Sequence, residues 1–532
     1  MSTITHSPVY LPGWRPVYDT LKHHVVYAVN PSPQITKYSK NMKTIHVIFL
    51  ILSPLLMPNL VFAKGEIIRS IIIDQNSVFS KEKIKSLMKT KVGGEYDPVQ
   101  LEIDLENIVS FYKRHGYSYA CYSKEPKFFT DGVYLWITID EGKIGRIIVN
   151  GNQRTKERII LQDLLFKPGD IYNEEDELES ERILRRKPYL GKAEITTDYN
   201  PITEKVGVIV EVSDLWTFFP ALSLPSFSGG DSDMMIAISD YNILGYGQSS
   251  RLRYKQERED GNAQHLFSAA YTEPRLFTTH LQFSGKYIYK QEGISWELSF
   301  LRPLYSLKEK WATEVKIADS IDIAKWYENG KITDEFEQTT RYRFGSITRV
   351  LGDRKEQTQI SFWFKHDKEN FNPLKQVPNS KARFKNFKDN TLGATIQHGK
   401  IHFIQETFLD KMGRVEDIAL GYNYGISVGY SSPLWDSDAS ETYVALAMAN
   451  AQKRGHRTFI NASAQLSNSI AEHLFRDFIF EGKARYLVKE FLRQTLAMQL
   501  SWWLGHRLDG RRQFLLGGQN GLRGYKARQF NG

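Results

Sequence analysis

The chain has a single cysteine, Cys121, among its 532 residues. An intrachain disulfide is therefore impossible, and the fold must be stable without one. Long hydrophobic runs are also scarce: the only one spans residues 45–62, and Pro54 and Pro58 interrupt it. With 25% charged residues and a mean hydropathy of −0.41, the composition excludes a bundle of membrane-spanning helices.

Concentrated charge and catalytic motifs are lacking as well. The net charge of +9 is spread along the chain without a basic stripe, so we predict no nucleic-acid partner. The sequence contains no phosphate-binding loop, no zinc-binding spacing and no Ser-His-Asp constellation. We therefore predict a protein that is not an enzyme and that uses no cofactor and no metal.

Three patterns imitate catalytic or metal-binding motifs, and each has a simpler interpretation. The string Gly-Ile-Ser-Val-Gly around Ser427 resembles a hydrolase motif, which requires a strained strand-to-helix turn, but Ser427 lies within a strand pattern. His398 and His402 have a metal-binding spacing only on a helix, and their segment is also typical of a strand. Asp231 and Asp233 follow two glycines, and we interpret them as solvated turn residues.

The apolar run near the N-terminus is typical of a secretory signal peptide. A lysine precedes it, its apolar core is short, and residues 61–63 (Val-Phe-Ala) fit a cleavage site. We predict a signal peptide over 42–63, with an uncleaved membrane anchor as the alternative. Residues 1–41 show no helical or strand period, and we predict an unstructured extension that translation from Met42 would omit.

Hydrophobic and small residues alternate without interruption over residues 418–430. One face carries Ile418, Leu420, Tyr422, Tyr424, Ile426, Val428 and Tyr430. The other carries Ala419, Gly421, Asn423, Gly425, Ser427 and Gly429. Successive side chains of a strand point to opposite faces. A run of this length matches a tilted strand that crosses a bilayer.

The same period recurs in residues 281–290, 295–300 and 495–502. Because every backbone polar group in a bilayer must be paired, membrane-spanning strands form closed barrels. We therefore predict an antiparallel transmembrane β-barrel over 215–532, with the 13% aromatic residues supplying its interfacial girdles. A large soluble β-sandwich shares the period and is the alternative.

An internal repeat precedes the barrel pattern. Residues 91–97 (KVGGEYD) align with residues 167–173 (KPGDIYN), and the same offset relates Asn76 to Asn152. Each copy shows the order strand, helix, helix, strand, strand, which predicts two α+β modules.

Helix caps and apolar stripes define the elements of each copy. In the first, we predict helix N-caps at Ser80 and Asp97 and a buried stripe at Leu101, Leu105, Ile108 and Tyr112. The strands of this copy are expected at residues 71–73, 117–124 and 133–139. In the second copy, the predicted caps are Thr155 and Asn173, and the last two strands fall near 193–199 and 205–212.

These features resemble POTRA domains, the periplasmic modules that precede the barrels of outer-membrane assembly and secretion proteins. The resemblance rests on the start Gly151-Asn152-Gln153-Arg154-Thr155, on the Lys-x-Gly-x-x-Tyr turn and on the element order. It places POTRA-like domains at 64–141 and 142–214. It also implies that exposed sheet edges bind a strand of an unfolded client. The predicted client-binding edges are Tyr119, Ala120, Cys121, Tyr122 and Ser123, and Ala193, Glu194, Ile195, Thr196 and Thr197.

The barrel segment resembles the same superfamily. Residues 240–247 are similar to a strand-end turn of its barrels, and residues 517–525 (GGQNGLRGY) match its hallmark loop. The resemblance implies that the loop folds back into the barrel lumen, where its arginine meets acidic groups. The predicted lumenal residues are Gly521, Leu522, Arg523, Gly524 and Tyr525.

The barrel segment looks short for this family. At about 25 to 30 residues per strand and connection, it holds roughly 11 or 12 strands, whereas the family's barrels have about sixteen. We therefore expect a barrel that is incomplete at its C-terminus.

The resemblance implies an outer-membrane factor that binds unfolded or secreted polypeptides and inserts or passes them through its barrel. Its expected partners are these clients, outer-membrane lipid and accessory periplasmic or inner-membrane proteins. A secretion pore dedicated to one client and a non-catalytic porin or receptor are the alternatives.

Overall fold

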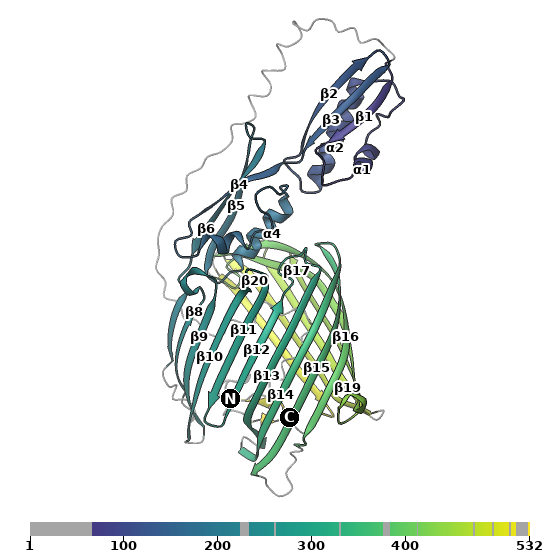
Figure 1. Ribbon diagram of the computed structural model, residues 1–532. Helices are drawn as coiled ribbons and strands as arrows, with labels where there is room; N and C mark the ends of the chain where they lie inside the picture. The colour runs from purple at the N-terminus through teal and green to yellow at the C-terminus, as the bar shows by residue number, and fades with distance from the viewer. Residues whose placement is uncertain are drawn as a thin grey trace.

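The computed structural model describes residues 66–223, 233–259, 262–328, 331–375, 384–411, 413–471, 474–491, 494–509, 512–517 and 530–531. Two small α+β modules lie one after the other beyond one end of a large curved sheet (Figure 1). The predicted signal peptide and residues 1–41 lie outside the described residues. In the described ranges, no helix combines the length and the apolar character needed to cross a membrane.

Module 1 has the predicted element order: β1 (Ile68–Asp74), α1 (Lys81–Leu87), α2 (Pro98–Arg114), β2 (Cys121–Phe129) and β3 (Gly132–Asp140). Its sheet has the order β1-β3-β2, with β1 parallel and β2 antiparallel to β3. Both predicted caps are confirmed, since Ser80 accepts a hydrogen bond from Lys83 N–H and Asp97 accepts from Val99 and Gln100. The predicted stripe of α2 is fully buried against the sheet.

One predicted strand of module 1 begins too early. The interpretation of residues 117–124 as a strand is wrong at its start, because β2 begins at Cys121. Residues 117–120 form a turn in which Ala120 N–H donates to the Tyr117 carbonyl oxygen at 3.2 Å. The local apolar pattern could not separate this turn from the strand that follows it.

Module 2 repeats this architecture with β4 (Lys143–Asn150), α3 (Glu157–Leu161), α4 (Glu174–Arg185), β5 (Leu190–Asn200) and β6 (Lys205–Asp214) in the sheet order β4-β6-β5. Asn173 caps α4 as predicted, accepting a hydrogen bond from Glu175 N–H at 3.0 Å. The predicted cap at Thr155 is wrong: Lys156 occupies the N-cap of α3, and the Thr155 hydroxyl donates to Asp214 instead.

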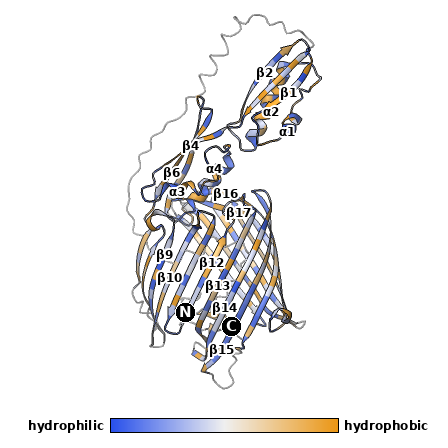
Figure 2. Cartoon of the chain, in the orientation of Figure 1, coloured by the Kyte–Doolittle hydropathy of each residue, from blue (hydrophilic) through white to orange (hydrophobic). Residues whose placement is uncertain are grey.

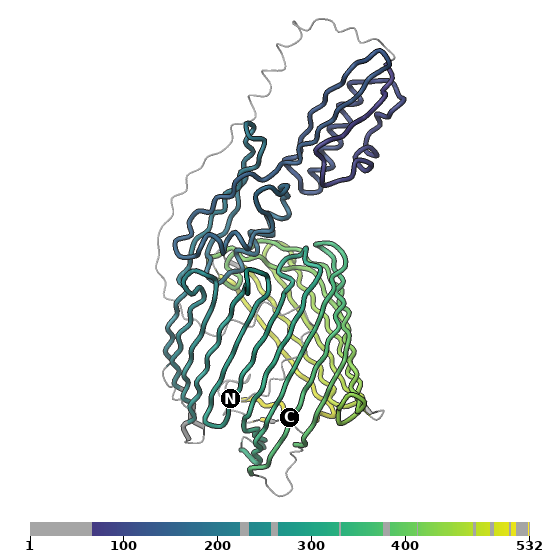
Figure 3. The backbone as a smooth tube through the Cα atoms, viewed as in Figure 1, coloured from purple at the N-terminus to yellow at the C-terminus, as the bar shows by residue number. Residues whose placement is uncertain are grey.

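Strands β7 to β21 form one fifteen-stranded antiparallel sheet in which each strand pairs with its neighbours in sequence. The sheet curves round into a barrel, and its backbone runs up and down without crossovers (Figures 1 and 3). The fold class predicted from the sequence is confirmed. The strands are β7 (Phe218–Ser223), β8 (Asp233–Asp240), β9 (Ser249–Glu259), β10 (Asn262–Leu276), β11 (Leu281–Lys290), β12 (Gly293–Arg302), β13 (Trp311–Glu328), β14 (Lys331–Gly352), β15 (Glu356–Lys375), β16 (Phe387–Thr407), β17 (Val415–Ser431), β18 (Glu441–Arg454), β19 (Thr458–Ala471), β20 (Leu474–Phe491) and β21 (Gln494–His506), with short 3₁₀ turns η1 (Ile243–Gly245) and η2 (Pro433–Trp435).

The predicted count of 11 or 12 strands is wrong. The 289 residues from Phe218 to His506 hold fifteen strands, about 19 residues for each strand with its connection. Several connections are tight turns, such as the two residues between β11 and β12 and the three between β18 and β19. The estimate assumed longer loops than this barrel has.

The alternation that predicted the barrel is confirmed in β17, and hydrophobic and polar residues alternate along the other strands (Figure 2). The side chains from Tyr422 to Tyr430 on the hydrophobic face are exposed on the outside. The exposed face is shorter than predicted, however. Leu420 is buried, and Ile418 packs beside a cluster that contains Leu409.

The serine and histidine motifs lie in strands, as predicted, whereas the interpretation of Asp233 as a turn residue is wrong. Ser427 is in the middle of β17, where its hydroxyl pairs with that of Thr395 at 2.8 Å. His398 and His402 lie in β16. Asp233 is the first residue of β8 rather than a turn residue, and Asp231 lies outside the described residues. Within the described ranges, no three His, Cys, Asp or Glu side chains are grouped to hold a metal.

Beyond β21, two short strands pair antiparallel: β22 (Leu515–Leu516) and β23 (Phe530–Asn531). The Gln513 side chain exchanges hydrogen bonds of 2.8 and 2.9 Å with the backbone of Tyr327 at the end of β13. The predicted hallmark loop, Gly521 to Tyr525, lies between these two strands and outside the described residues.

Candidate functional site

Helix α4 lies on the side of module 2 that faces the near end of the barrel (Figure 1). Four charged side chains of this helix are buried: Asp176, Glu179, Glu181 and Arg182. Burying a charge is costly unless a partner of opposite charge and hydrogen bonds compensate it. The barrel turns supply these partners.

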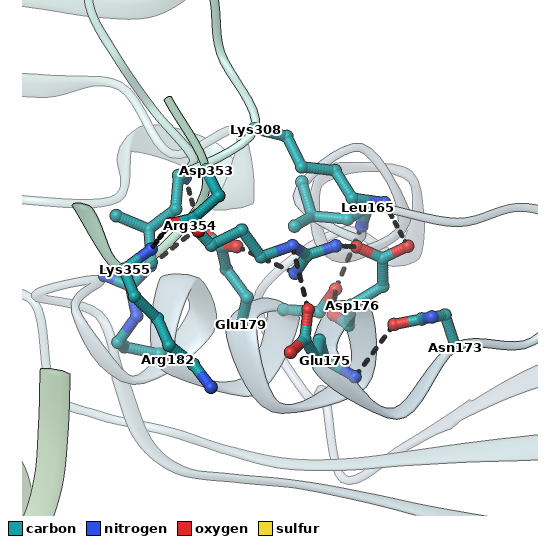
Figure 4. A network of polar contacts seen from close by, with 12 residues as sticks. Leu165, Asn173, Glu175, Asp176, Glu179, Arg182, Lys308, Asp353, Arg354 and Lys355 are labelled. Atoms are coloured by element: carbon teal, nitrogen blue, oxygen red, sulfur yellow. Dashed lines mark hydrogen bonds and ion pairs between the residues drawn. The ribbon is translucent and has the colours of Figure 1, made fainter. Parts of the chain in front are cut away.

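The first cluster surrounds Arg354, in the turn between β14 and β15 (Figure 4). Its guanidinium contacts Glu175 at 3.3 Å, Glu179 at 3.2 Å and Asp176. Lys308, from the connection between β12 and β13, also contacts Asp176. These carboxylates lie in the first half of α4, where the helix dipole favours negative charge. Two barrel turns are thus attached to one helix.

The second cluster lies at the other end of α4. Arg185 makes two hydrogen bonds to Asp417 of β17, at 2.8 and 2.9 Å, and one to Glu181 at 2.9 Å. Burial alone would lower the pKa of Arg185, but the hydrogen bonds to Asp417 and Glu181 outweigh it and raise the pKa. Arg182 packs over the Phe403 ring at 4.1 Å. The helix is therefore anchored along its whole length.

A third contact fixes the loop that precedes α4. The buried carboxylate of Asp163 contacts Arg275, near the end of β10, and Lys187 at 2.8 Å. Beside it, the rings of His280 and Tyr305 stack with their centroids 3.4 Å apart. Burial and the nearby Arg275 lower the pKa of His280 to about 4, so this imidazole is neutral at physiological pH.

Two sequence motifs meet at the fourth contact. The turn after β8 contributes Asp240 and Asn242, which bond to Arg154 at 2.9 Å and to Thr155 at 2.8 Å. Gly245, at φ +82°, lies so close that a Cβ atom would be 2.1 Å from the Arg154 carbonyl oxygen. The glycine is required here for close approach. We call these four contacts together the module 2–barrel joint.

The two predicted client-binding edges differ in accessibility. In module 2, β5 is an edge strand, but α4 covers part of it. Ile195 N–H donates to Glu181 at 2.7 Å, and the Ala193 carbonyl accepts from Arg185 at 3.2 Å. These two backbone groups cannot pair with a further strand while α4 stays in place.

In module 1, β2 is an edge strand, and within the described residues only β3 pairs with it. A two-residue turn joins β2 to β3, so Phe129 and Gly132 form the hydrogen-bonded closing pair. By alternation, the backbone groups of Tyr122, Lys124 and Phe128 point to the open side. Pro126, which lacks an N–H, falls at a position of the same kind, as expected on an edge strand.

Not all predicted edge residues lie on the open strand. Tyr119 and Ala120 precede β2, and Ala120 is buried. The Tyr119 hydroxyl donates to Thr197 of β5 at 2.9 Å, and its ring packs against Tyr172. Tyr119 and Thr197 therefore join the two modules, and Cys121, Tyr122 and Ser123 remain as edge candidates.

The modules match a known family. Residues 66–142 and 143–214 each match the POTRA family, described as a surface antigen variable number repeat. Both modules of the chain belong to the POTRA family, and a fifteen-stranded antiparallel sheet follows them. The chain lies in the outer membrane, with its POTRA modules in the periplasm.

Curated relatives include outer-membrane assembly factors. One from Treponema pallidum (strain Nichols) is 24% identical over 263 residues, which is 46% of this chain and 31% of the relative. BamA, the outer membrane protein assembly factor of Buchnera aphidicola subsp. Acyrthosiphon pisum (strain APS), is 35% identical over 121 residues, 20% of each chain. The chain thus matches about a third and a fifth of these relatives' lengths.

Similar solved structures include CdiB from Escherichia coli, with a TM-score of 0.46 and 11% identity over 85% of this chain and 92% of that one. BamA from Haemophilus ducreyi lacking POTRA domains 1–3 gives a TM-score of 0.34 and 13% identity over 83% and 87%.

Sequence reasoning missed most residues of the joint in this POTRA-barrel protein. Arg354, Arg275 and Asp417 are single charges in turns or strand ends, with no pattern around them. One signal was available in α4: Asp176, Glu179 and Arg182 follow helical spacing, which places three charges on one helical face.

Proposed function

We propose that this protein handles unfolded polypeptides at the outer membrane, binding them through module 1 and inserting or passing them via its barrel. The observation that supports this most directly is the open edge of β2 beside the covered edge of β5. The named relatives are outer-membrane assembly factors, which agrees with this role.

A client strand would add to β2 by backbone hydrogen bonding, a mode that tolerates many sequences. Tyr122, Lys124 and Phe128 would supply donors and acceptors on the open side. Exposed apolar side chains of α2, Val99 and Ile103, would contact hydrophobic residues of the client. Binding would therefore combine sequence-independent pairing with a modest apolar preference.

The module 2–barrel joint would keep the bound client close to the barrel. With α4 anchored to three hairpins and the Asp163 loop to a fourth, module 2 is held at the barrel mouth and carries module 1 with it. The driving force would come from client folding and burial in the membrane. In this proposal the protein binds and moves polypeptide and catalyses no bond change.

We also propose that residues 521–525 lie in the lumen, as the family resemblance implies. The pairing of β22 with β23 supports this, since it brings the two ends of the loop together. The contact of Gln513 with Tyr327 ties the base of this hairpin to β13.

Lys124→Pro tests the edge. It removes one outward N–H from β2 without removing a bond to β3, so we expect about a tenfold loss of client affinity from one lost hydrogen bond and a steric block. The readout is binding of an unfolded outer-membrane barrel peptide to the full-length protein in detergent. Lys124→Ala is the matched control, because it removes the contact with Glu102 and keeps the N–H.

Equal affinities for wild type, Lys124→Pro and Lys124→Ala would refute strand addition at β2. Equal losses in both variants would place recognition in the Lys124 side chain instead.

A secretion pore dedicated to one client is the second candidate, favoured by the presence of two modules between residues 66 and 214. Depletion in cells separates the two candidates. Loss of many outer-membrane barrels supports assembly, loss of one secreted protein supports the pore, and altered uptake of small solutes alone supports a porin.

A further inference from the structure

The outer wall of the barrel contains a hollow across β18–β21. Hydrophobic side chains from β18, β19 and β20, among them Leu466 and Phe475, form most of its lining. Its three polar residues are Asn468, His506 and Arg507.

Strand register places this hollow on the lipid-facing side. Val444, in its lining, lies opposite Val428, whose side chain is exposed on the outer face of β17. Asn468 lies opposite Val444 in the next pair of strands and so faces the same way. The start of β17 is at the module end, so the end of β19 and the start of β20, beside the hollow, are at the far end, toward the outer leaflet.

Asn468 is the feature that needs a partner. It lies at a register shift between β19 and β20, and its side chain is only 7% exposed. Its Oδ1 atom has no hydrogen-bond partner among the described residues. A buried amide oxygen on the membrane face is unfavourable without a donor, and such groups commonly mark functional positions.

His506 and Arg507 lie at the rim of the hollow and are exposed. Within the part of the chain that the structure describes, the Arg507 guanidinium forms no ion pair, while its carbonyl accepts a hydrogen bond from Asp477 N–H at 3.0 Å. The backbone of this residue is thus fixed, and its charge has no acidic partner among the described residues. A guanidinium matches the geometry of a phosphate group.

We propose that this hollow binds an outer-membrane lipid whose head group carries both a phosphate and a hydrogen-bond donor. The phosphate bonds to Arg507 beside His506, an amine or hydroxyl donates to Asn468 Oδ1, and an acyl chain packs against the apolar lining. The site goes beyond client handling, since none of its residues belongs to the joint or to β2.

The test is native mass spectrometry of the delipidated full-length protein in detergent, titrated with phosphatidylethanolamine. We expect one retained lipid, and about tenfold weaker binding in Arg507→Gln and in Asn468→Leu, because each removes one polar contact. Arg454→Gln is the matched charge control, on the same outer face of β18 but at the module end. Asn461→Leu is the matched amide control, at a lumen-facing position of β19.

Three further ligands show which part of the lipid is responsible for binding. Diacylglycerol, which lacks phosphate, should bind at least tenfold more weakly, and inorganic phosphate alone should not bind. Lipid A in place of phosphatidylethanolamine identifies whether a glycolipid is preferred. Equal lipid retention by all four variants and wild type, or equal binding of diacylglycerol, would overturn the proposal. Heat-dependent gel mobility verifies that each variant is folded.

Discussion

The two modules share one fold but use their second helix differently. Helix α2 of module 1 buries Leu101, Leu105, Ile108 and Tyr112 against its own sheet, and its buried Asp104 is satisfied locally by Thr90 and Gln100. Helix α4 of module 2 instead buries a row of charges that pair with barrel turns. Helix α2 thus contributes only to the core of its own module, whereas α4 also forms the contact with the barrel.

This difference explains why only one sheet edge is open. Glu181 and Arg185, which help to hold Asp417, also bond to the backbone of β5. The anchored module therefore closes its own edge, and the distal module keeps β2 free. One copy of the fold is thus anchored to the barrel, and the other copy keeps an open sheet edge.

The largest expected effect comes from reversing the central charge of the joint. Arg354→Glu places a fourth carboxylate beside Glu175, Asp176 and Glu179, all within 3.3 Å of the present guanidinium. We expect a loss of about 5 kcal/mol of docking free energy, at the upper end for a broken buried pair. Hydrogen exchange of α4 in the full-length protein should increase strongly.

Lys355→Glu is the control for this variant, since it reverses an exposed charge in the same turn. If α4 exchanged equally slowly in Arg354→Glu and Lys355→Glu, the Arg354 cluster would not hold the module.

The next prediction compares the loss of a buried contact of the joint with the loss of an exposed one, and both losses are smaller than that of Arg354→Glu. Arg185→Ala leaves Asp417 and Glu181 buried without their partner, so we expect a loss of about 3 kcal/mol. Arg154→Ala removes a pair with Asp240 in which Arg154 is 38% exposed, and we expect at most about 1 kcal/mol. Protection of α4 against exchange measures both; similar losses would contradict the ranking.

Opening the covered edge would make module 2 resemble module 1. Glu181→Ala removes the acceptor of Ile195 N–H, which costs about 1 to 2 kcal/mol locally. We expect client crosslinking to a photoreactive residue at Thr196 to increase while crosslinking at Tyr122 stays constant. Glu174→Ala, on the exposed first turn of α4, should leave both sites unchanged. Constant crosslinking at Thr196 in Glu181→Ala would indicate that α4 does not restrict this edge.

The elements of both modules could be predicted because local signals dictate them: caps at Ser80, Asp97 and Asn173, and the helical period of the α2 stripe. The outer face of β17 followed equally from its period of two. The joint could not be predicted, since Arg354 and Asp176 are 178 residues apart and only the packing of module 2 against the curved sheet brings them together. The covering of β5 was missed for the same reason, because it depends on side chains that reach the strand from a separate helix.

The smallest expected effect concerns a carboxyl group of α4 that lacks a basic partner. Burial is the main cause of the raised pKa of Glu177; the hydrogen bond from Tyr172 at 2.5 Å opposes it, and Glu181 and Glu174 raise it further. A raised carboxyl pKa in the folded state means that stability falls as the pH rises from the unfolded value of 4.5 to the folded value, and stays lower above it. Glu177→Gln keeps an acceptor for Tyr172 and removes the charge, so α4 should exchange more slowly than in wild type at pH 7 and equally at pH 4. Glu174→Gln, on an exposed position of the same turn, removes only the smallest of these causes, so its gain should be much smaller. A gain that persists unchanged at pH 4 would place the effect in packing rather than in ionisation.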